Sequence, residues 1–172
     1  MERRAALKGL ATAIGGLVAL PSWASNWNQN SLQPTDLLSA EEVPLLASVV
    51  DTIIPATDTP GAKELGVDRF VQLMLTDCYD KKAQDTLVSG LATVEEDSKE
   101  TFGKSFTACS AAQRIHILEG MSLSDNPSSK AFFGMVKGLT IQGYMSSEYV
   151  MINITKYSMI PPAWNACVPV TQ

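Results

Sequence analysis

Few side chains in this 172-residue chain could carry out chemistry. His116 is the only histidine, and it lies between Ile115 and Ile117. One histidine cannot build a His-rich zinc or copper site. A Ser-His-Asp triad would have to recruit it without the Gly-x-Ser-x-Gly turn, which is absent from the sequence. The chain also has no GxGxxG, phosphate-loop or CxxCH motif. We interpret His116 as a surface or half-buried helix residue.

Paired carboxylates are the other candidates for acid-base chemistry. Asp77 and Asp80 are three residues apart, and Asp51 lies opposite or beside an apolar helix stripe. Carboxylates at helix ends usually accept hydrogen bonds from backbone amides. We therefore expect Asp80 to cap a helix and Asp51 to bond the amides of the loop that follows it. The sequence predicts no catalytic, cofactor-binding or metal-binding residue in this chain.

The cysteines Cys78, Cys109 and Cys167 form an odd set. At most one bridge can form within the chain, which leaves one thiol free or paired with another chain. Their spacings suit neither zinc nor a CxxC redox pair. Cys78 also falls on an apolar helix face, where it would be a small buried hydrophobe. Cys167 belongs to an extended tail and is the easiest of the three to reach from another chain.

The elements that must position these residues are predicted to be helices. Ser39 and Glu42 have capping-box spacing, and the apolar stripe that follows runs to Pro55. A second helix is expected from Val67, because apolar residues recur there at spacings of three and four. Asp80 would cap a third helix with a solvated acidic face. The residues expected on these apolar faces are Val43, Leu46, Val49, Val50, Ile53, Ile54, Phe70, Val71, Met74, Leu75, Cys78, Leu87, Leu91 and Val94.

The rest of the chain predicts two or three more helices and an extended end. Ser110 and Gln113 form a second capping box, for a helix that ends near Gly120. A fifth helix, from about 130 to 142, would bury Phe132, Phe133, Val136 and Leu139. Residues 144–157 can hold one more helix, and three prolines make the C-terminal tail extended. The sequence therefore predicts an all-α domain over residues 39–172, a compact bundle of about five to six helices with an extended Pro-rich C-terminal tail.

Residues 1–24 have the pattern of an export signal. Small residues precede Ser25, so we expect cleavage after Ala24. The apolar run of this leader is broken by glycines and is shorter than the ~20 residues that span a bilayer. We expect a signal for twin-arginine export, because Arg3, Arg4, Leu7 and Lys8 match its pattern. The alternatives are a Sec signal that contains Arg-Arg and a retained membrane anchor.

Charge limits the partners that the exported chain can have. The chain has a net charge of −5 at pH 7, and its leader is basic, so the remainder is more acidic still. An acidic surface argues against nucleic acid and against direct binding to anionic lipids. Residues 25–38 are polar and aperiodic and are expected to form a flexible tether. The sequence predicts a periplasmic domain.

Several stretches together resemble the gluconate 2-dehydrogenase subunit 3 family. They begin with Leu38-Ser-Ala-Glu-Glu-Val, Val50-Asp-Thr-Ile-Ile-Pro-Ala-Thr-Asp-Thr-Pro-Gly-Ala and Gly66-Val-Asp-Arg-Phe. They continue with Phe132-Phe133, Leu139-Thr140, Gly143-Tyr144, Ser147-Glu148 and Cys167-Val-Pro. The resemblance covers almost the whole chain after the leader. The sequence departs from the family pattern at Pro44 and over residues 149–154.

The resemblance implies a small accessory subunit of periplasmic dehydrogenases that act on sugars or sugar acids, such as gluconate 2-dehydrogenase. Its implied partners are an FAD-binding large subunit of the glucose-methanol-choline type and a multihaem cytochrome c. FAD and haem c would therefore belong to the partners, and the assembly would be peripheral to the membrane. Glucoside 3-dehydrogenases have a similar small subunit, which leaves the substrate open. The resemblance implies no catalytic residue in this chain.

The favoured function is that of an escort, a non-catalytic subunit that binds the folded flavoprotein, lends it the export signal and stabilises it. Aromatic residues and Met are enriched at interface cores, so the candidate interface residues are Tyr144, Met145, Tyr149, Trp164 and Cys167. Cys167 is the candidate for a bridge to the large subunit. The apolar tail with Trp164 either packs on its own domain or docks on a partner.

Two alternatives remain beside the escort. One is a free-standing helical periplasmic enzyme or ligand-binding module that uses Asp51, Asp77 or His116. The other is a membrane-retained scaffold for the cytochrome subunit.

Overall fold

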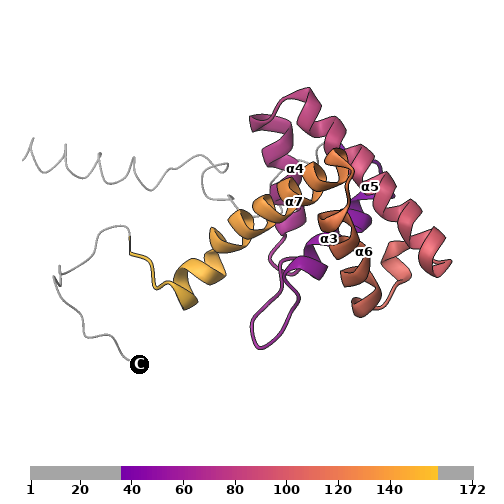
Figure 1. Cartoon of the computed structure of the whole chain (residues 1–172). Coiled ribbons are helices and arrows are strands. Elements are labelled where there is room, and N and C mark those ends of the chain that lie inside the picture. Colours follow the sequence, from indigo (N-terminus) through magenta and orange to yellow (C-terminus); the bar gives the residue numbers. More distant parts are fainter. Residues whose placement is uncertain (1–35, 159–172) are drawn as a thin grey trace, which may run out of the picture. The chain divides into compact units, whose positions relative to one another are not determined.

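The computed structural model describes residues 36–158, and the leader, most of the tether and the C-terminal tail lie outside them. The described residues form helices and no strand, which confirms the all-α prediction (Figure 1). Within this range no helix is long and apolar enough to span a membrane. The α-helices are α3 (Glu42–Ile53), α4 (Val67–Cys78), α5 (Lys81–Phe102), α6 (Ala111–Leu123) and α7 (Pro127–Met145). The 3-10 helix η2 (Phe106–Ala108) and the π-helix η3 (Val150–Ile154) complete the order.

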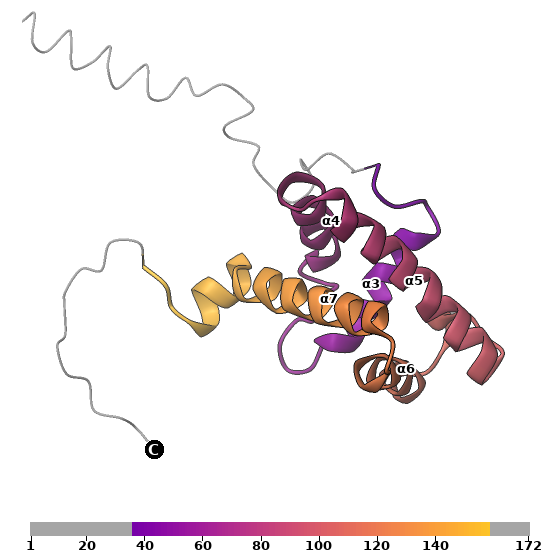
Figure 2. The ribbon, with the colours of Figure 1, turned by 45° about the horizontal axis from the view of Figure 1, so that its top comes forward.

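Helix α7 is central and packs against α3, α4, α5 and α6 (Figures 1 and 2). Its inward side chains Phe132, Val136 and Leu139 are at most 2% exposed, as the helical spacing predicts. The surrounding helices contribute apolar faces at the predicted spacing. The core residues from these helices are Leu45, Leu46, Val49, Val50, Val67, Val71, Leu75, Leu87, Leu91, Val94, Ile117, Leu118 and Met121.

Two glycines let α7 approach its neighbours closely. A methyl group on Gly90 of α5 would stand 2.1 Å from Cδ2 of Phe132, so the aromatic ring occupies the space that a side chain would need. A methyl group on Gly143 of α7 would stand 2.6 Å from Cδ1 of Phe70 in α4. The bundle therefore depends on the missing side chain at both contacts.

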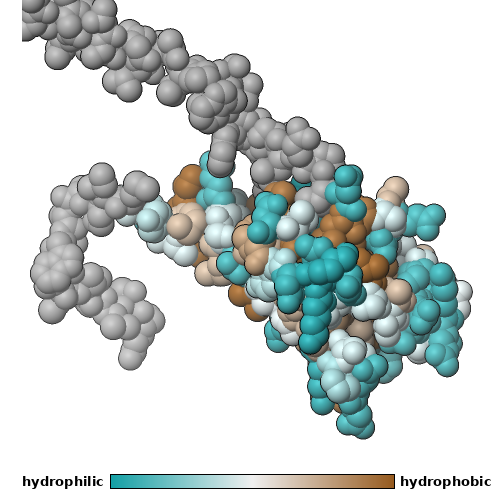
Figure 3. All heavy atoms as spheres, turned by 90° about the horizontal axis from the view of Figure 1, so that it is seen from above, coloured by the Kyte–Doolittle hydropathy of each residue, from teal (hydrophilic) through white to brown (hydrophobic). Residues whose placement is uncertain are grey.

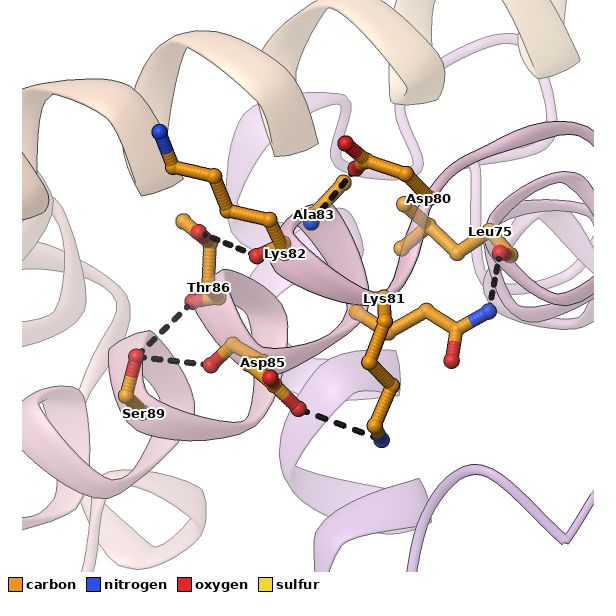
Figure 4. Close-up of polar contacts among 9 residues, drawn as sticks. Leu75, Asp80, Lys81, Lys82, Ala83, Asp85, Thr86 and Ser89 are labelled. Atoms are coloured by element: carbon orange, nitrogen blue, oxygen red, sulfur yellow. Dashed lines mark hydrogen bonds and ion pairs between the residues drawn. The ribbon is translucent and has the colours of Figure 1, made fainter.

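The predicted caps form at two helices. The Asp80 carboxylate accepts a hydrogen bond of 3.0 Å from the Ala83 amide and begins α5 (Figure 4). Gly103, at φ +65°, ends this helix in the left-handed conformation that glycine adopts most readily. Ser110 and Gln113 form a complete capping box at the start of α6.

The first capping box forms only by half. The Glu42 carboxylate accepts a hydrogen bond from the Ser39 amide at 2.8 Å. Helix α3 begins at Glu42, however, and the side chain of its N-cap residue, Glu41, makes no capping hydrogen bond. The chain already packs before Ser39, because Leu38 is only 8% exposed and belongs to the core. The packed domain therefore includes the last residue of the predicted tether.

Three helix ends differ from the sequence prediction, one in α6 and two in α7. Helix α6 continues through Gly120 to Leu123, because a glycine in the middle of a helix costs only about 1 kcal/mol and does not force an end. Helix α7 starts at Pro127, since the Asn126 side chain caps the Ser128 amide and proline fits the first turn. It continues through Gly143 to Met145.

The close contact at Gly90 gives a prediction about stability. Gly90→Ala should destabilise the domain by about 1–3 kcal/mol, because the new methyl group overlaps the Phe132 ring. The matched control is Gly138→Ala on α7, where nothing lies within 4 Å of an added methyl group. It should stabilise by about 0.5–1 kcal/mol through helix propensity. Urea unfolding followed by circular dichroism measures both, and a Gly90→Ala protein as stable as the wild type would contradict the packing described.

Candidate partner interface

The structure does not assemble the candidate chemical residues into one site. His116 is exposed on α6, and its ring meets Phe102 edge-on at 6.1 Å between ring centroids. Asp77 is exposed, and Asp80 caps α5 as predicted. Asp51 has a different partner from the loop amides that we expected, since its carboxylate lies 3.9 Å from Nη1 of Arg114. No group of three or more His, Cys, Asp or Glu within residues 36–158 could hold a metal ion.

Glu95 forms a structural junction that the sequence analysis missed. We expected it on the solvated face of α5, but its side chain is only 23% exposed. The carboxylate accepts hydrogen bonds of 3.1 Å from the Phe106 amide and from Oγ of Ser105, and it lies 3.1 Å from Nζ of Lys99. Burial raises the pKa of Glu95, but these hydrogen bonds and Lys99 more than offset it, so the pKa lies below its ordinary value.

Arg114 completes the junction from α6. Its Nε donates to the carbonyl oxygen of Phe106 at 3.1 Å, and its Nη2 donates to that of Thr107 at 2.6 Å. Glu95 thus holds η2 through the Phe106 amide, and Arg114 holds it through two carbonyl oxygens. The side chains of Glu95 and Arg114 therefore both have structural roles. Asp51 lies beside this structural arginine.

A hollow of about 550 Å³ lies beside this junction, between the start of α3, α5 and the η2 segment. Its charged lining includes Glu95 and Lys99, which already pair with each other, and Glu42, which bonds the Ser39 amide. These groups are therefore engaged in holding the fold together.

Exposed apolar side chains gather instead at the end of α7 and in η3. This end of the described chain lies past the other helices, and brown side chains show there in Figure 3. We call these residues the C-terminal apolar surface. They are Ile141 (44% exposed), Met145 (49%), Ile152 (60%), Ile154 (52%) and Tyr157 (60%).

The interface residues predicted from the sequence lie in different environments. Met145 belongs to the C-terminal apolar surface, and Tyr149 is half-buried. Tyr144 is half-buried as well, and its hydroxyl donates to the carbonyl oxygen of Pro60 at 3.1 Å. Tyr144 therefore ties the loop before α4 to the end of α7. Trp164 and Cys167 lie outside the described residues.

Of the cysteines, Cys78 and Cys109 are described and both are free, so they do not bridge to each other. The prediction that Cys78 is buried is wrong. Helix α4 ends at this residue, one turn beyond the last fully covered position at Leu75, and the thiol is exposed. Cys109 is 5% exposed, in the turn before α6.

The comparisons with known proteins identify the family of the chain. The family model described as Gluconate 2-dehydrogenase subunit 3 matches residues 40–161, and the chain belongs to this family. No curated protein and no solved structure matches the chain. As the family's name states, its members are subunits of a gluconate 2-dehydrogenase, which implies association with the other subunits.

The Glu95 junction gives a prediction about pH. Because its folded pKa is lowered, Glu95 contributes stability above the pKa of the unfolded state, and this stability is lost as the pH falls through the folded pKa. Glu95→Gln should cost about 1–2 kcal/mol near neutral pH and should flatten the acid limb of stability against pH. The control Glu96→Gln changes an exposed neighbour and should stay within about 0.5 kcal/mol. Unfolding midpoints measured across the acid range decide, and an unchanged acid limb in Glu95→Gln would refute the role of this carboxylate.

The cysteine positions give a prediction about thiol reactivity. In the native protein Cys78 should be alkylated by iodoacetamide much faster than Cys109, because only the Cys78 thiol is exposed. In urea the two thiols should react at similar rates. Mass spectrometry of the digested protein assigns the label to each cysteine. Equal native rates would mean that Cys109 is not buried as the structure has it.

Proposed function

We propose that this chain is a non-catalytic accessory subunit that escorts and stabilises a periplasmic FAD-dependent dehydrogenase of sugars or sugar acids. Its partner is a folded large subunit of the glucose-methanol-choline type, which binds the FAD. A multihaem cytochrome c then takes the electrons. The observation that carries this proposal is the family match, which extends from just before α3 to beyond η3 and so covers the helical domain.

The distribution of polar groups supports a binding role. The charged residues that could resemble a catalytic set, namely Asp51, Glu95 and Arg114, hold helices and the η2 turn together. His116, the only histidine, lies exposed against an aromatic ring. Most of the large apolar side chains that are exposed in the described range lie at the end of α7, in η3 or just after it. A subunit of this kind acts by burying surface, and stable obligate pairs commonly bury more than ~2,000 Å².

If the large subunit binds this chain, the export signal of this chain can serve both proteins. Arg3, Arg4, Leu7 and Lys8 match the twin-arginine pattern, whose export route takes folded proteins. A flavoprotein must fold to hold FAD, so it can cross as cargo if it is bound before export. The escort role therefore requires that the two subunits associate in the cytoplasm and stay together during passage.

The decisive variant is Arg3→Lys/Arg4→Lys, tested in cells that also produce the large subunit. We expect both proteins to remain in the cytoplasm, because the cargo depends on this leader. The matched control is Glu2→Ser. The twin-arginine pattern usually has serine or threonine at this position, so this variant should keep both proteins in the periplasm. Immunoblots of fractionated cells measure the outcome. If the flavoprotein still reaches the periplasm when this chain does not, the escort role is wrong.

A further inference from the structure

We propose that the large subunit docks on the C-terminal apolar surface, where α7 ends and η3 follows. This inference rests on the proposed function and adds to it the place of contact. The surface consists of two α7 side chains one helical turn apart, Ile141 and Met145, and of three side chains in or just after η3, Ile152, Ile154 and Tyr157.

The exposure of these residues is the first argument. Soluble monomers rarely leave extended apolar patches open to water, and such patches commonly mark protein contacts. The five residues follow one another along the chain, and η3 packs against α7. The other large exposed apolar side chains in the described range are Tyr79, Ile115 and Leu123, which lie on or beside α4 and α6.

The charge pattern is the second argument, and it selects the kind of partner. From residue 138 to the last residue, Glu148 and Lys156 are the only charged side chains, one of each sign, in a chain with 18 acidic and 13 basic residues. Interface cores are depleted in charge and enriched in Met and Tyr. Helices that lie on membranes instead carry many Lys and Arg residues on their polar face. The surface therefore suits the neutral, apolar face of a protein.

Local structure holds this surface in a defined shape. Val150 is fully buried, and the Tyr157 amide donates to the carbonyl oxygen of Met151 at 2.8 Å. Lys156 has a φ of +49°, an uncommon conformation for a residue with a side chain. Tyr144 fixes the preceding helix end to the loop at Pro60. π-Helical turns occur frequently at functional sites, and here the turn presents apolar side chains that stay exposed among residues 36–158.

The sequence that follows this surface also favours a large partner. The described chain stops at residue 158, directly after Tyr157, and the sequence continues with Trp164 and Cys167. A partner that covers Tyr157 is therefore close along the sequence to these candidate interface residues. A second copy of this chain is the competing occupant of the surface.

The test uses full-length subunits co-produced with an affinity-tagged large subunit. Ile152→Asp/Ile154→Asp places two charges on the surface, and we expect the amount of co-purified small subunit to fall about tenfold or more, as charges in an apolar interface core do. The matched control Leu123→Asp changes an 80% exposed apolar residue on α6 and should leave capture unchanged. Tyr157→Ala is a second, milder variant, and circular dichroism of each free variant confirms that it folds.

The outcomes separate this proposal from the one on which it rests. If the wild-type chain fails to co-purify, the proposed function itself is wrong. If the wild-type chain and both surface variants are captured equally, the accessory role stands, but the docking surface is elsewhere. If light scattering shows that the free chain dimerises and only the surface variants lose that dimer while capture persists, a second copy occupies the surface and the proposal is overturned.

Discussion

The fold depends on the contacts that bury one side of α7 against α3, α4, α5 and α6. Phe132 fills the space that Gly90 leaves open on α5, and Val136 and Leu139 continue the buried side of the helix. Gly143 gives the last close contact, against Phe70 of α4. Beyond these contacts Met145, Ile152 and Ile154 are about half exposed or more among the described residues. The same packing therefore builds the core and leaves an apolar end exposed.

The polar groups of the domain serve this packing. Glu95 and Arg114 hold the η2 turn from α5 and α6, and Arg114 also lies near Asp51 of α3. Three helices and a short turn are joined in this way at one side of the bundle. Carboxylates and a guanidinium so engaged have little freedom to bind a substrate. In the proposed function, these groups hold the helices together and the chain contributes through its contact surface.

The sequence predicted the helices well where local signals act alone. Apolar spacing identified the buried faces of α4 and α7. Asp80 and Ser110 predicted the caps of α5 and α6, because capping involves neighbouring residues. The sequence predictions failed where contacts between residues far apart in the chain determine whether a side chain is buried. Glu95 resembles its exposed neighbours until η2 folds back on α5, and Cys78 shares the α4 stripe but lies past the covered turns. For the proposed interface, the aromatic and Met content of the sequence indicated the region around Met145. The internal bond of Tyr144 and the exposure of Ile152 and Ile154 required the three-dimensional arrangement.

The most direct measurement is hydrogen–deuterium exchange of this chain, free and in complex with the large subunit. If the chain acts by docking its apolar end, amides at the end of α7 and through η3 should gain protection in the complex, and those around Asp51, His116 and Arg114 should change little. Protection confined to the Asp51–Arg114 side, with none at η3, would contradict the account and point to a different working surface.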